Sequence, residues 1–319
     1  MWRCSSPVRV PDARSVRRNV RPMWRTWREA MTGALYGDNG FYLGSGVPSR
    51  HFRTAAHVGS RWADAIAALA TRVDDELGRP GDFTIVDVGA GGGELLAHLA
   101  GSAPDRWSLT GVDVAVRPSG LPARVGWQRQ FPQGVRGLVV AVELLDVVPL
   151  DVVVLDTDVP RTVEVDEEGT ERLGPPASTD DLDWLARWWP LRSVGDRAEI
   201  GRPRDHLWHD LTDGLEAGLA VAVDYAANPM DHVAGTLSGY RDGRHRGPVP
   251  GTKMDLTAHV LFESLRHDGD FILTQREALR RLGVSADPPD YDADRAGYLD
   301  NLTRATASAE LLNPEGLGG

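Results

Sequence analysis

Apolar positions along the chain follow two different spacings. Between residues 60 and 77 they recur every three or four positions, which predicts an amphipathic helix that ends at Gly78. Short apolar runs at 84–88, 107–112, 124–127, 137–142 and 218–223 predict strands, and the last two are apolar enough to be buried. A helical pattern at Leu95, Leu96 and Leu99 separates the first two runs. The sequence therefore predicts an α/β fold with a parallel sheet.

The remaining pattern predicts segments added to this sheet. Residues 24–35 are helical in pattern, 151–173 alternate like a hairpin with its turn at 166–169, and a Trp-rich helix follows around Trp184. Residues 226–252 are rich in Gly, Pro and Arg, which is typical of a long loop. We expect one domain over 24–319 with insertions near 151–200 and 226–255. Residues 1–23 form an Arg-rich segment with little periodicity, and we expect a disordered basic extension there rather than a nucleic-acid arm or a targeting peptide.

Composition narrows the class of protein. The net charge of −11 argues against a general nucleic-acid binder, which would have to neutralise phosphates. Cys4 is the single cysteine, so no internal disulfide or cysteine-based zinc site is expected. His206 and His209 have metal-like spacing, but only Asp205 and Asp210 lie beside them, so we predict no metal site. No apolar run reaches the roughly 18 residues of a membrane span. We expect a cytoplasmic enzyme with neither a nucleic acid nor a membrane as partner.

A glycine-rich turn, Gly-Ala-Gly-Gly-Gly, follows the strand at 84–88 and precedes a helix. Glycines let the backbone turn tightly and approach a ligand, and such folds bind cofactors beyond the carboxyl ends of strands. The dinucleotide motif G-x-G-x-x-G would need a glycine at Glu94, whose carboxylate disfavours a pyrophosphate. The acidic residue before the turn suits a cationic ligand without phosphate. The pattern favours S-adenosylmethionine (SAM) over a dinucleotide or a turn without ligand, with these binding residues: Asp87, Gly89, Ala90, Gly91 and Gly93.

The strand at 107–112 ends at a second acid, Asp113, which lies 20 residues past Gly93. At this separation a βαβ unit brings a carboxylate to the hydroxyl groups of a ribose. An acid at a strand end is otherwise often a solvated loop residue. Because it pairs with the glycine turn, we predict that Asp113 binds the cofactor's ribose.

Four further blocks occur in a fixed order along the chain. They are residues 27–37 with 40–42, the run Glu143-Leu144-Leu145-Asp146-Val147-Val148-Pro149, the pair Asp224-Tyr225, and a downstream block over 235–241, 255–260 and 274–275. In order and spacing, these blocks resemble the MidA-like SAM-dependent methyltransferases, a class I group with a mitochondrial branch. The resemblance covers the chain from about Trp24 onward.

This resemblance implies a Rossmann-like class I methyltransferase sheet, with helices on both faces and inserted hairpin and loop segments, and SAM as cofactor. The mitochondrial branch of the family methylates an arginine on a respiratory complex I subunit and supports assembly of that complex. The resemblance therefore implies methyl transfer to an arginine nitrogen of a protein substrate. A small-molecule methyltransferase and a SAM-binding assembly protein with little turnover stay open.

The chain departs from the family pattern at several positions. Thr54-Ala55-Ala56-His57 stands where the family has T-S-P-E, which removes a carboxylate. Val142 replaces the asparagine before E-L-L-D, and Ala226 replaces the glycine of D-Y-G. These departures point to a divergent substrate.

Two acids after the strand at 137–142 are the main catalytic candidates. A guanidinium has a pKa above 12 and is a poor nucleophile, so carboxylates must hold its fork and aim one nitrogen. Glu143 and Asp146 are expected at the cofactor edge of the sheet, and their spacing of three puts them on one face if the segment begins a helix. Simple capping of that helix is the alternative. His259 is a further candidate, either as a base or as a structural histidine, and Tyr225 either packs on the substrate or on the sheet.

Overall fold

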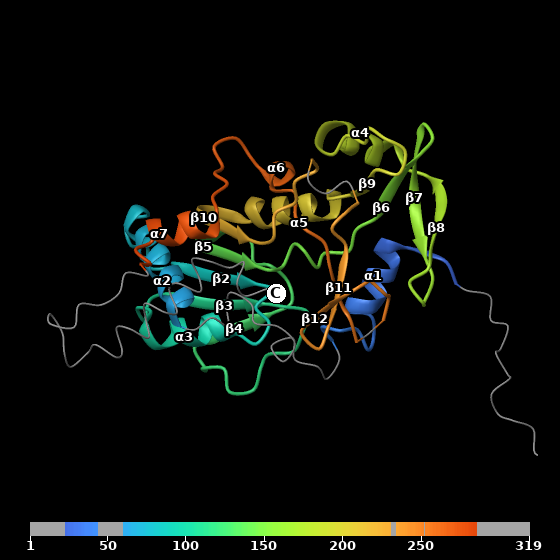
Figure 1. Cartoon of the computed structure of the whole chain (residues 1–319). Helices are drawn as coiled ribbons and strands as arrows, with labels where there is room; N and C mark the ends of the chain where they lie inside the picture. The colour runs from blue at the N-terminus through green and yellow to red at the C-terminus, as the bar shows by residue number, and fades with distance from the viewer. Residues whose placement is uncertain (1–22, 44–59, 231–233, 252, 286–319) are drawn as a thin grey trace, which may run out of the picture.

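The computed structural model describes residues 23–43, 60–230, 234–251 and 253–285. Its centre is a sheet of parallel strands in the order β10 (Leu215–Val223), β5 (Val135–Val142), β2 (Thr84–Val88), β3 (Ser108–Val112) and β4 (Val125–Gln128). Helices α2 (Ser60–Glu76), α3 (Glu94–Ser102) and α7 (Gln275–Arg281) cover one face, and α5 (Arg202–Asp213) and α6 (Phe262–Leu265) cover the other (Figure 1). The predicted Rossmann-like sheet with helices on both faces is confirmed.

Alternation along the strands explains why both faces carry helices. In β5, Leu138 and Val140 pack into the core with α2 and α3, while Val139 and Ala141 pack into the core with α5 and α6. All four side chains are at most 1% exposed. A strand buried on both faces needs this continuous apolar run, which is the signal that the sequence carried.

Strand β10 differs from its prediction as a buried strand. Every residue from Leu215 to Val223 is half-buried or exposed, and Leu219 is 39% exposed. Among the described strands, β10 pairs only with β5. An apolar run alone does not tell a strand with described neighbours on both sides, such as β5, from one with a described neighbour on one side, such as β10, and this explains the error.

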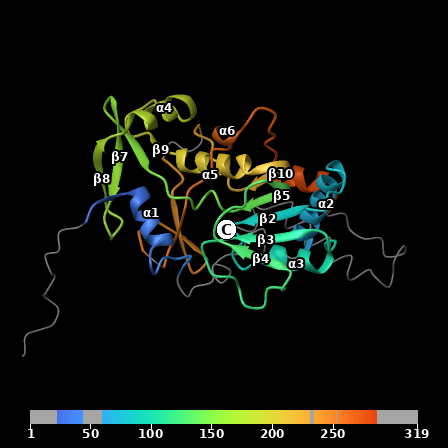
Figure 2. The ribbon, with the colours of Figure 1, turned by 180° about the vertical axis from the view of Figure 1, so that it is seen from behind.

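An antiparallel sheet lies beside the parallel one, toward the opposite end of the molecule (Figures 1 and 2). It has the order β1 (Arg25–Thr26), β7 (Val159–Val165), β6 (Val152–Asp156) and β9 (Arg197–Glu199), with β8 (Glu171–Pro176) also paired to β7. Helix α1 (Trp27–Tyr36) packs on it through Trp27 and Met31, and α4 (Thr179–Trp188) follows β8. The single hairpin predicted over 151–173 is therefore three strands, because an additional turn at Thr157, with φ +54°, separates β6 from β7.

The segment predicted as a long loop over 226–252 contains regular structure. Strands β11 (Ser238–Arg241) and β12 (Arg244–Arg246) form a hairpin, and β11 also pairs with β13 (Asp255–Thr257). The hairpin turn is Asp242-Gly243, both with positive φ, which suits a tight two-residue connection. The loop prediction was wrong because it relied on the high Gly and Pro content of the segment. The short turn signal at Asp242-Gly243, which indicates a hairpin, was missed.

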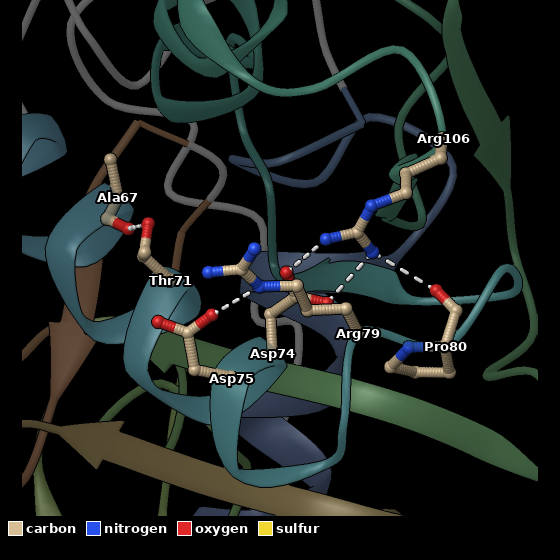
Figure 3. Close-up of polar contacts among 7 residues, drawn as sticks. All are labelled: Ala67, Thr71, Asp74, Asp75, Arg79, Pro80 and Arg106. Atoms are coloured by element: carbon tan, nitrogen blue, oxygen red, sulfur yellow. Dashed lines mark hydrogen bonds and ion pairs between the residues drawn. The ribbon is translucent and has the colours of Figure 1, made fainter.

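A buried ion pair holds the end of α2 to the loop before β3 (Figure 3). The guanidinium of Arg106 donates to both carboxylate oxygens of Asp74 and to the carbonyl of Pro80, 3.0 Å away. The Asp74 side chain is 3% exposed. Its bonds to Arg106 hold the pKa of Asp74 below its ordinary value. On the exposed side of the same turn, Arg79 donates to Asp75 over 2.7 Å.

No helix in the described part of the chain is long and apolar enough to cross a membrane. Of the expected basic extension over 1–23, only Met23 belongs to the described residues, and the departure at 54–57 lies outside them too.

Candidate active site

The glycine turn leaves the carboxyl end of β2 and leads into α3. Gly89, Gly91 and Gly93 have φ of +74°, +54° and +75°, a region that side chains with a Cβ rarely adopt. The Gly89 N–H donates to the Val112 carbonyl over 2.8 Å, which ties the turn to the end of β3. A Cβ on Gly89 would lie 2.9 Å from Leu144 Cδ1, whereas one on Gly91 would meet open space apart from a carbonyl at 4.0 Å. The turn therefore presents bare backbone on the side of Gly91.

Asp113 lies against this bare backbone. Its Oδ2 accepts the Gly91 N–H over 2.8 Å, and its Oδ1 accepts the Ala115 N–H over 2.7 Å. The two sequence features predicted to share the cofactor, the glycine turn and the acid after β3, are thus in direct contact. A carboxylate and a bare glycine turn fit a nucleoside with free ribose hydroxyls.

Asp87 lies beneath the turn at 6% exposure. Burial raises its pKa to about 7, and the neighbouring charges of Asp113 and Glu94 add to the effect. A buried acid among other acids favours a cationic ligand over a phosphate-bearing one. These residues fit SAM, whose sulfonium and ammonium groups are positive.

Glu143 and Asp146 follow β5 at the same edge of the sheet. They do not begin a helix, as the spacing argument supposed: the segment is an irregular turn in which Glu143 has φ +50°. The N–H groups of Leu145 and Asp146 donate to Oδ2 of Asp224 over 2.9 and 3.1 Å. A carboxylate from the end of β10 therefore shapes this turn, in place of a helix.

Asp146 is a buried acid with an unpaired oxygen. It is 5% exposed, and among the described residues its buried Oδ1 has no hydrogen-bond partner. Burial raises its pKa well above the ordinary value, and the charges of Asp224, Asp255 and Glu143 raise it further. Asp224 and Asp255 themselves have pKa values raised to about 6, chiefly by burial. We call Glu143, Asp146, Asp224 and Asp255 the acidic cluster.

A buried arginine connects the turn that carries Asp146 to the loop that carries His259. Arg204, from the first turn of α5, is 2% exposed. It donates to the carbonyl of Asp146 over 2.7 Å and to that of His259 over 2.6 Å. Two of the predicted catalytic residues, far apart in sequence, are therefore held by one guanidinium. Its positive charge opposes the rise in the pKa of Asp146.

Aromatic side chains surround the acids. Tyr36, at the end of α1, donates to the Val147 carbonyl over 3.2 Å, and Tyr42 donates to Asp255 over 2.9 Å. The rings of Tyr225 and His259 stack with centroids 6.2 Å apart. Burial raises the pKa of Tyr36, and the charges of Asp146, Asp255 and Asp113 contribute to this rise. Tyr36 is therefore within electrostatic reach of both the acidic cluster and the acid beside the glycine turn.

Several of these residues were not predicted as site residues. Asp224, Asp255, Tyr36 and Tyr42 all lie in blocks that carried the family resemblance, so the signal was present as sequence similarity without an assigned role. Arg204 carried no such signal, because an arginine usually faces solvent and no element was predicted around it.

Comparisons with known proteins agree with this geometry. A model of the family described as "Putative S-adenosyl-L-methionine-dependent methyltransferase" matches residues 113–276. A solved COG1565 superfamily member from Burkholderia thailandensis, bound to S-adenosyl-homocysteine, has the same fold, with a TM-score of 0.74 and 22% identity over 92% of this chain and 85% of that chain. A second COG1565 superfamily structure from Burkholderia thailandensis gives a TM-score of 0.70 and 21% identity over 93% and 85% of the two chains. No curated protein matches.

The family match spans more than half of the sequence, from the acid beside the glycine turn to the start of α7. It includes the whole acidic cluster and Arg204. This bears out the resemblance to the MidA-like group that the separated sequence blocks carried. The chain belongs to the family of SAM-dependent methyltransferases, as a divergent member, and is an enzyme that uses SAM.

Proposed function

We propose that this methyltransferase acts on a guanidinium nitrogen of an arginine in a protein substrate, and that the acidic cluster binds this guanidinium. The observation that carries the proposal is the buried Oδ1 of Asp146, which has no hydrogen-bond partner in the described part of the chain and lies near other carboxylates. A buried carboxylate without a donor costs about 1 to 3 kcal/mol or more. A cationic donor from the substrate would remove this cost, whereas an anionic or apolar acceptor would increase it.

The residues of the cofactor site have a defined part in this proposal. Gly89, Ala90, Gly91 and Gly93 form the turn against which the cofactor lies, Asp113 accepts hydrogen bonds from its ribose, and Asp87 favours its positive charge. When bound, SAM supplies an electrophilic methyl group on a sulfonium. Catalysis then depends on how the chain places and prepares the nitrogen.

The acidic cluster prepares the nitrogen in two ways. Asp146 and Glu143 accept hydrogen bonds from two nitrogens of the guanidinium fork, which leaves the third directed at the methyl group. As the new N–C bond forms and the C–S bond breaks, the nitrogen releases one proton. Carboxylates with raised pKa values, such as Asp224 and Asp255, are suited to hold that proton near neutral pH. Arg204 and the tyrosines position these acids without contact to the substrate.

The test is incubation with methyl-labelled SAM and host lysate, followed by a count of label in protein and in small molecules. We expect label in protein, on arginine. Asp146→Asn keeps the size of the side chain, and it should lower kcat/KM at least about 100-fold while SAM affinity stays within about twofold. Asp105→Asn, which changes a fully exposed acid, is the matched control. Label found only in small molecules, or Asp146→Asn with full activity on the labelled protein, would overturn the proposal.

A further inference from the structure

The β11–β12 hairpin has two chemically different faces. In its antiparallel register, Arg241 lies opposite Arg244, Gly239 opposite Arg246, and Tyr240 opposite His245. Directly opposite residues point to the same face, and successive residues point to opposite faces. The three arginines therefore share one face, and Tyr240 and His245 share the other, where their rings meet edge to face with centroids 5.4 Å apart.

The aromatic face lies on the same side of its sheet as Asp255 of the acidic cluster, because Tyr240 is opposite Asp255 in the register of β11 with β13. The pKa of Tyr240 is raised by burial and by the negative charges of Asp146 and Asp255. The same tyrosine contributes to the raised pKa of Tyr225. The hairpin therefore adjoins the acidic cluster through its aromatic face, and the arginines lie on the opposite face. Figure 1 shows β11 and β12 beside α1.

The three arginines of this face are exposed and lie around a hollow, whereas its Gly239 end is buried against Met254. Arg241, Asp242, Arg244 and Arg246 line a hollow of about 440 Å³. Within the described residues, neither Arg244 nor Arg246 has an ion pair or side-chain hydrogen bond, and Arg241 has only a loose pair with Asp242 at 3.9 Å. Like charges directly opposite each other on two strands are destabilising. An arrangement that costs stability in a chain with a net charge of −11 indicates a ligand that supplies negative charge.

The outer strand of the hairpin is also suited to an extended chain. Among the described strands, β12 pairs only with β11. Its other edge carries backbone N–H and C=O groups with the spacing that an added peptide strand requires. Arginine is the side chain that recognises carboxylates through two parallel hydrogen bonds.

We propose that the arginine face of the β11–β12 hairpin docks an acidic, extended segment of the protein substrate. This rests on the proposed function, since the docked segment would flank the arginine that enters the acidic cluster. In this proposal the acidic cluster binds the positive arginine of the substrate, and the arginine face binds the acidic segment beside it. The two surfaces lie on opposite sides of the hairpin. A long polyanion such as RNA is disfavoured, because it would extend beyond these three arginines onto the surface of a chain whose net charge is −11, whereas a short acidic segment needs to contact only the hairpin.

The experiment measures binding by fluorescence anisotropy, with S-adenosyl-homocysteine present. The probe is a labelled peptide with one arginine flanked by glutamates, and its partner probe has the glutamates replaced by glutamine. R244E/R246E should weaken binding of the glutamate peptide at least about tenfold. R187E/R280E changes the net charge equally at two exposed arginines on α4 and α7 and should leave binding unchanged. R244K/R246K should keep part of the affinity, because lysine retains the charge and loses the fork.

Each outcome has a defined meaning. Equal binding of the two peptides, equal loss in both double variants, or tighter binding of an RNA oligonucleotide than of the peptide would overturn the docking proposal. A glutamate peptide whose arginine is replaced by glutamine should still bind through the hairpin. If it binds but no arginine peptide is methylated, the proposed function fails and the docking surface stands. If arginine peptides are methylated equally well by R244E/R246E, the docking surface fails and the proposed function stands.

Discussion

Replacing Asp87 with asparagine removes a buried carboxyl group whose effect on stability depends on pH. Below a pH of about 4, this carboxyl is protonated in both the folded and the unfolded chain, so its burial carries no charge penalty. Between about pH 4 and pH 7 the unfolded chain releases the proton while the folded chain keeps it, because burial has raised the pKa to about 7. The free energy of unfolding therefore falls as the pH rises through this range, and the penalty is constant above it.

The magnitude follows from the same pKa. A rise from 3.8 to about 7 corresponds to about 4 kcal/mol at pH 8. Asp87→Asn keeps the shape of the side chain and cannot ionise, so it should be more stable than the original protein by about this amount at pH 8 and nearly equal at pH 4. For a chain of this size the gain at pH 8 corresponds to about 10 °C in Tm.

The assay is thermal unfolding of both proteins from pH 4 to pH 8, with and without SAM. The exposed-acid variant Asp105→Asn should follow the original protein at every pH. SAM should raise the Tm of the original protein more than that of Asp87→Asn, because an ionised Asp87 favours a positive ligand. Parallel curves for Asp87→Asn and the original protein across this pH range would refute the claim that Asp87 is buried with a raised pKa.

Three other tests, the first with a matched control variant, address the glycine turn, the arginine between the loops and the ion pair at the end of α2. Gly89→Ala and its control Gly78→Ala both place an alanine at positive φ, at a cost of about 1 to 2 kcal/mol in folding free energy. Only Gly89→Ala adds a close contact, 2.9 Å from Leu144 Cδ1, so only this variant should also bind SAM more weakly in calorimetry. Equal SAM affinity in the two variants would contradict this. Arg204→Met should lower the free energy of unfolding in urea by about 4 kcal/mol, since two carbonyls lose a charged donor; a loss below about 1 kcal/mol would show that water replaces the guanidinium. Arg106→Gln should lower the Tm at pH 7, with a difference that shrinks below a pH of about 4 as the partner carboxyl protonates; a pH-independent difference would exclude the ion pair as its cause.

The parallel sheet, and the contact between its glycine turn and Asp113, were predictable because local chemistry specifies them. A buried strand needs an apolar run, a tight turn beside a ligand needs glycine, and the acid at the end of β3 follows at the separation that one βαβ unit sets. The contact between Asp113 and the Gly91 N–H is the direct result. No register between distant segments had to be known.

The acidic cluster could not be derived in this way, because long-range contacts assemble it. Asp146 and His259 are brought together by Arg204, which belongs to neither segment. The turn at Glu143 depends on a carboxylate, Asp224, that lies 78 residues beyond Asp146. Spacing within the segment predicted a helical turn, since nothing in its own sequence indicates the distant carboxylate.

The tyrosines near the acidic cluster belong to elements outside the parallel sheet. Tyr36 belongs to α1, whose core partners are β6, β7 and β13, and Tyr240 belongs to the β11–β12 hairpin. The parallel sheet supplies the cofactor turn and the acids at its edge, while the inserted segments supply the walls. Because the charges of both Asp113 and Asp146 raise the pKa of Tyr36, the end of α1 lies near both the acid beside the glycine turn and the acidic cluster. In the proposed function, the acids at the edge of the parallel sheet bind the guanidinium, and we expect the inserted segments that carry Tyr36 and Tyr240 to shape the approach of the rest of the substrate.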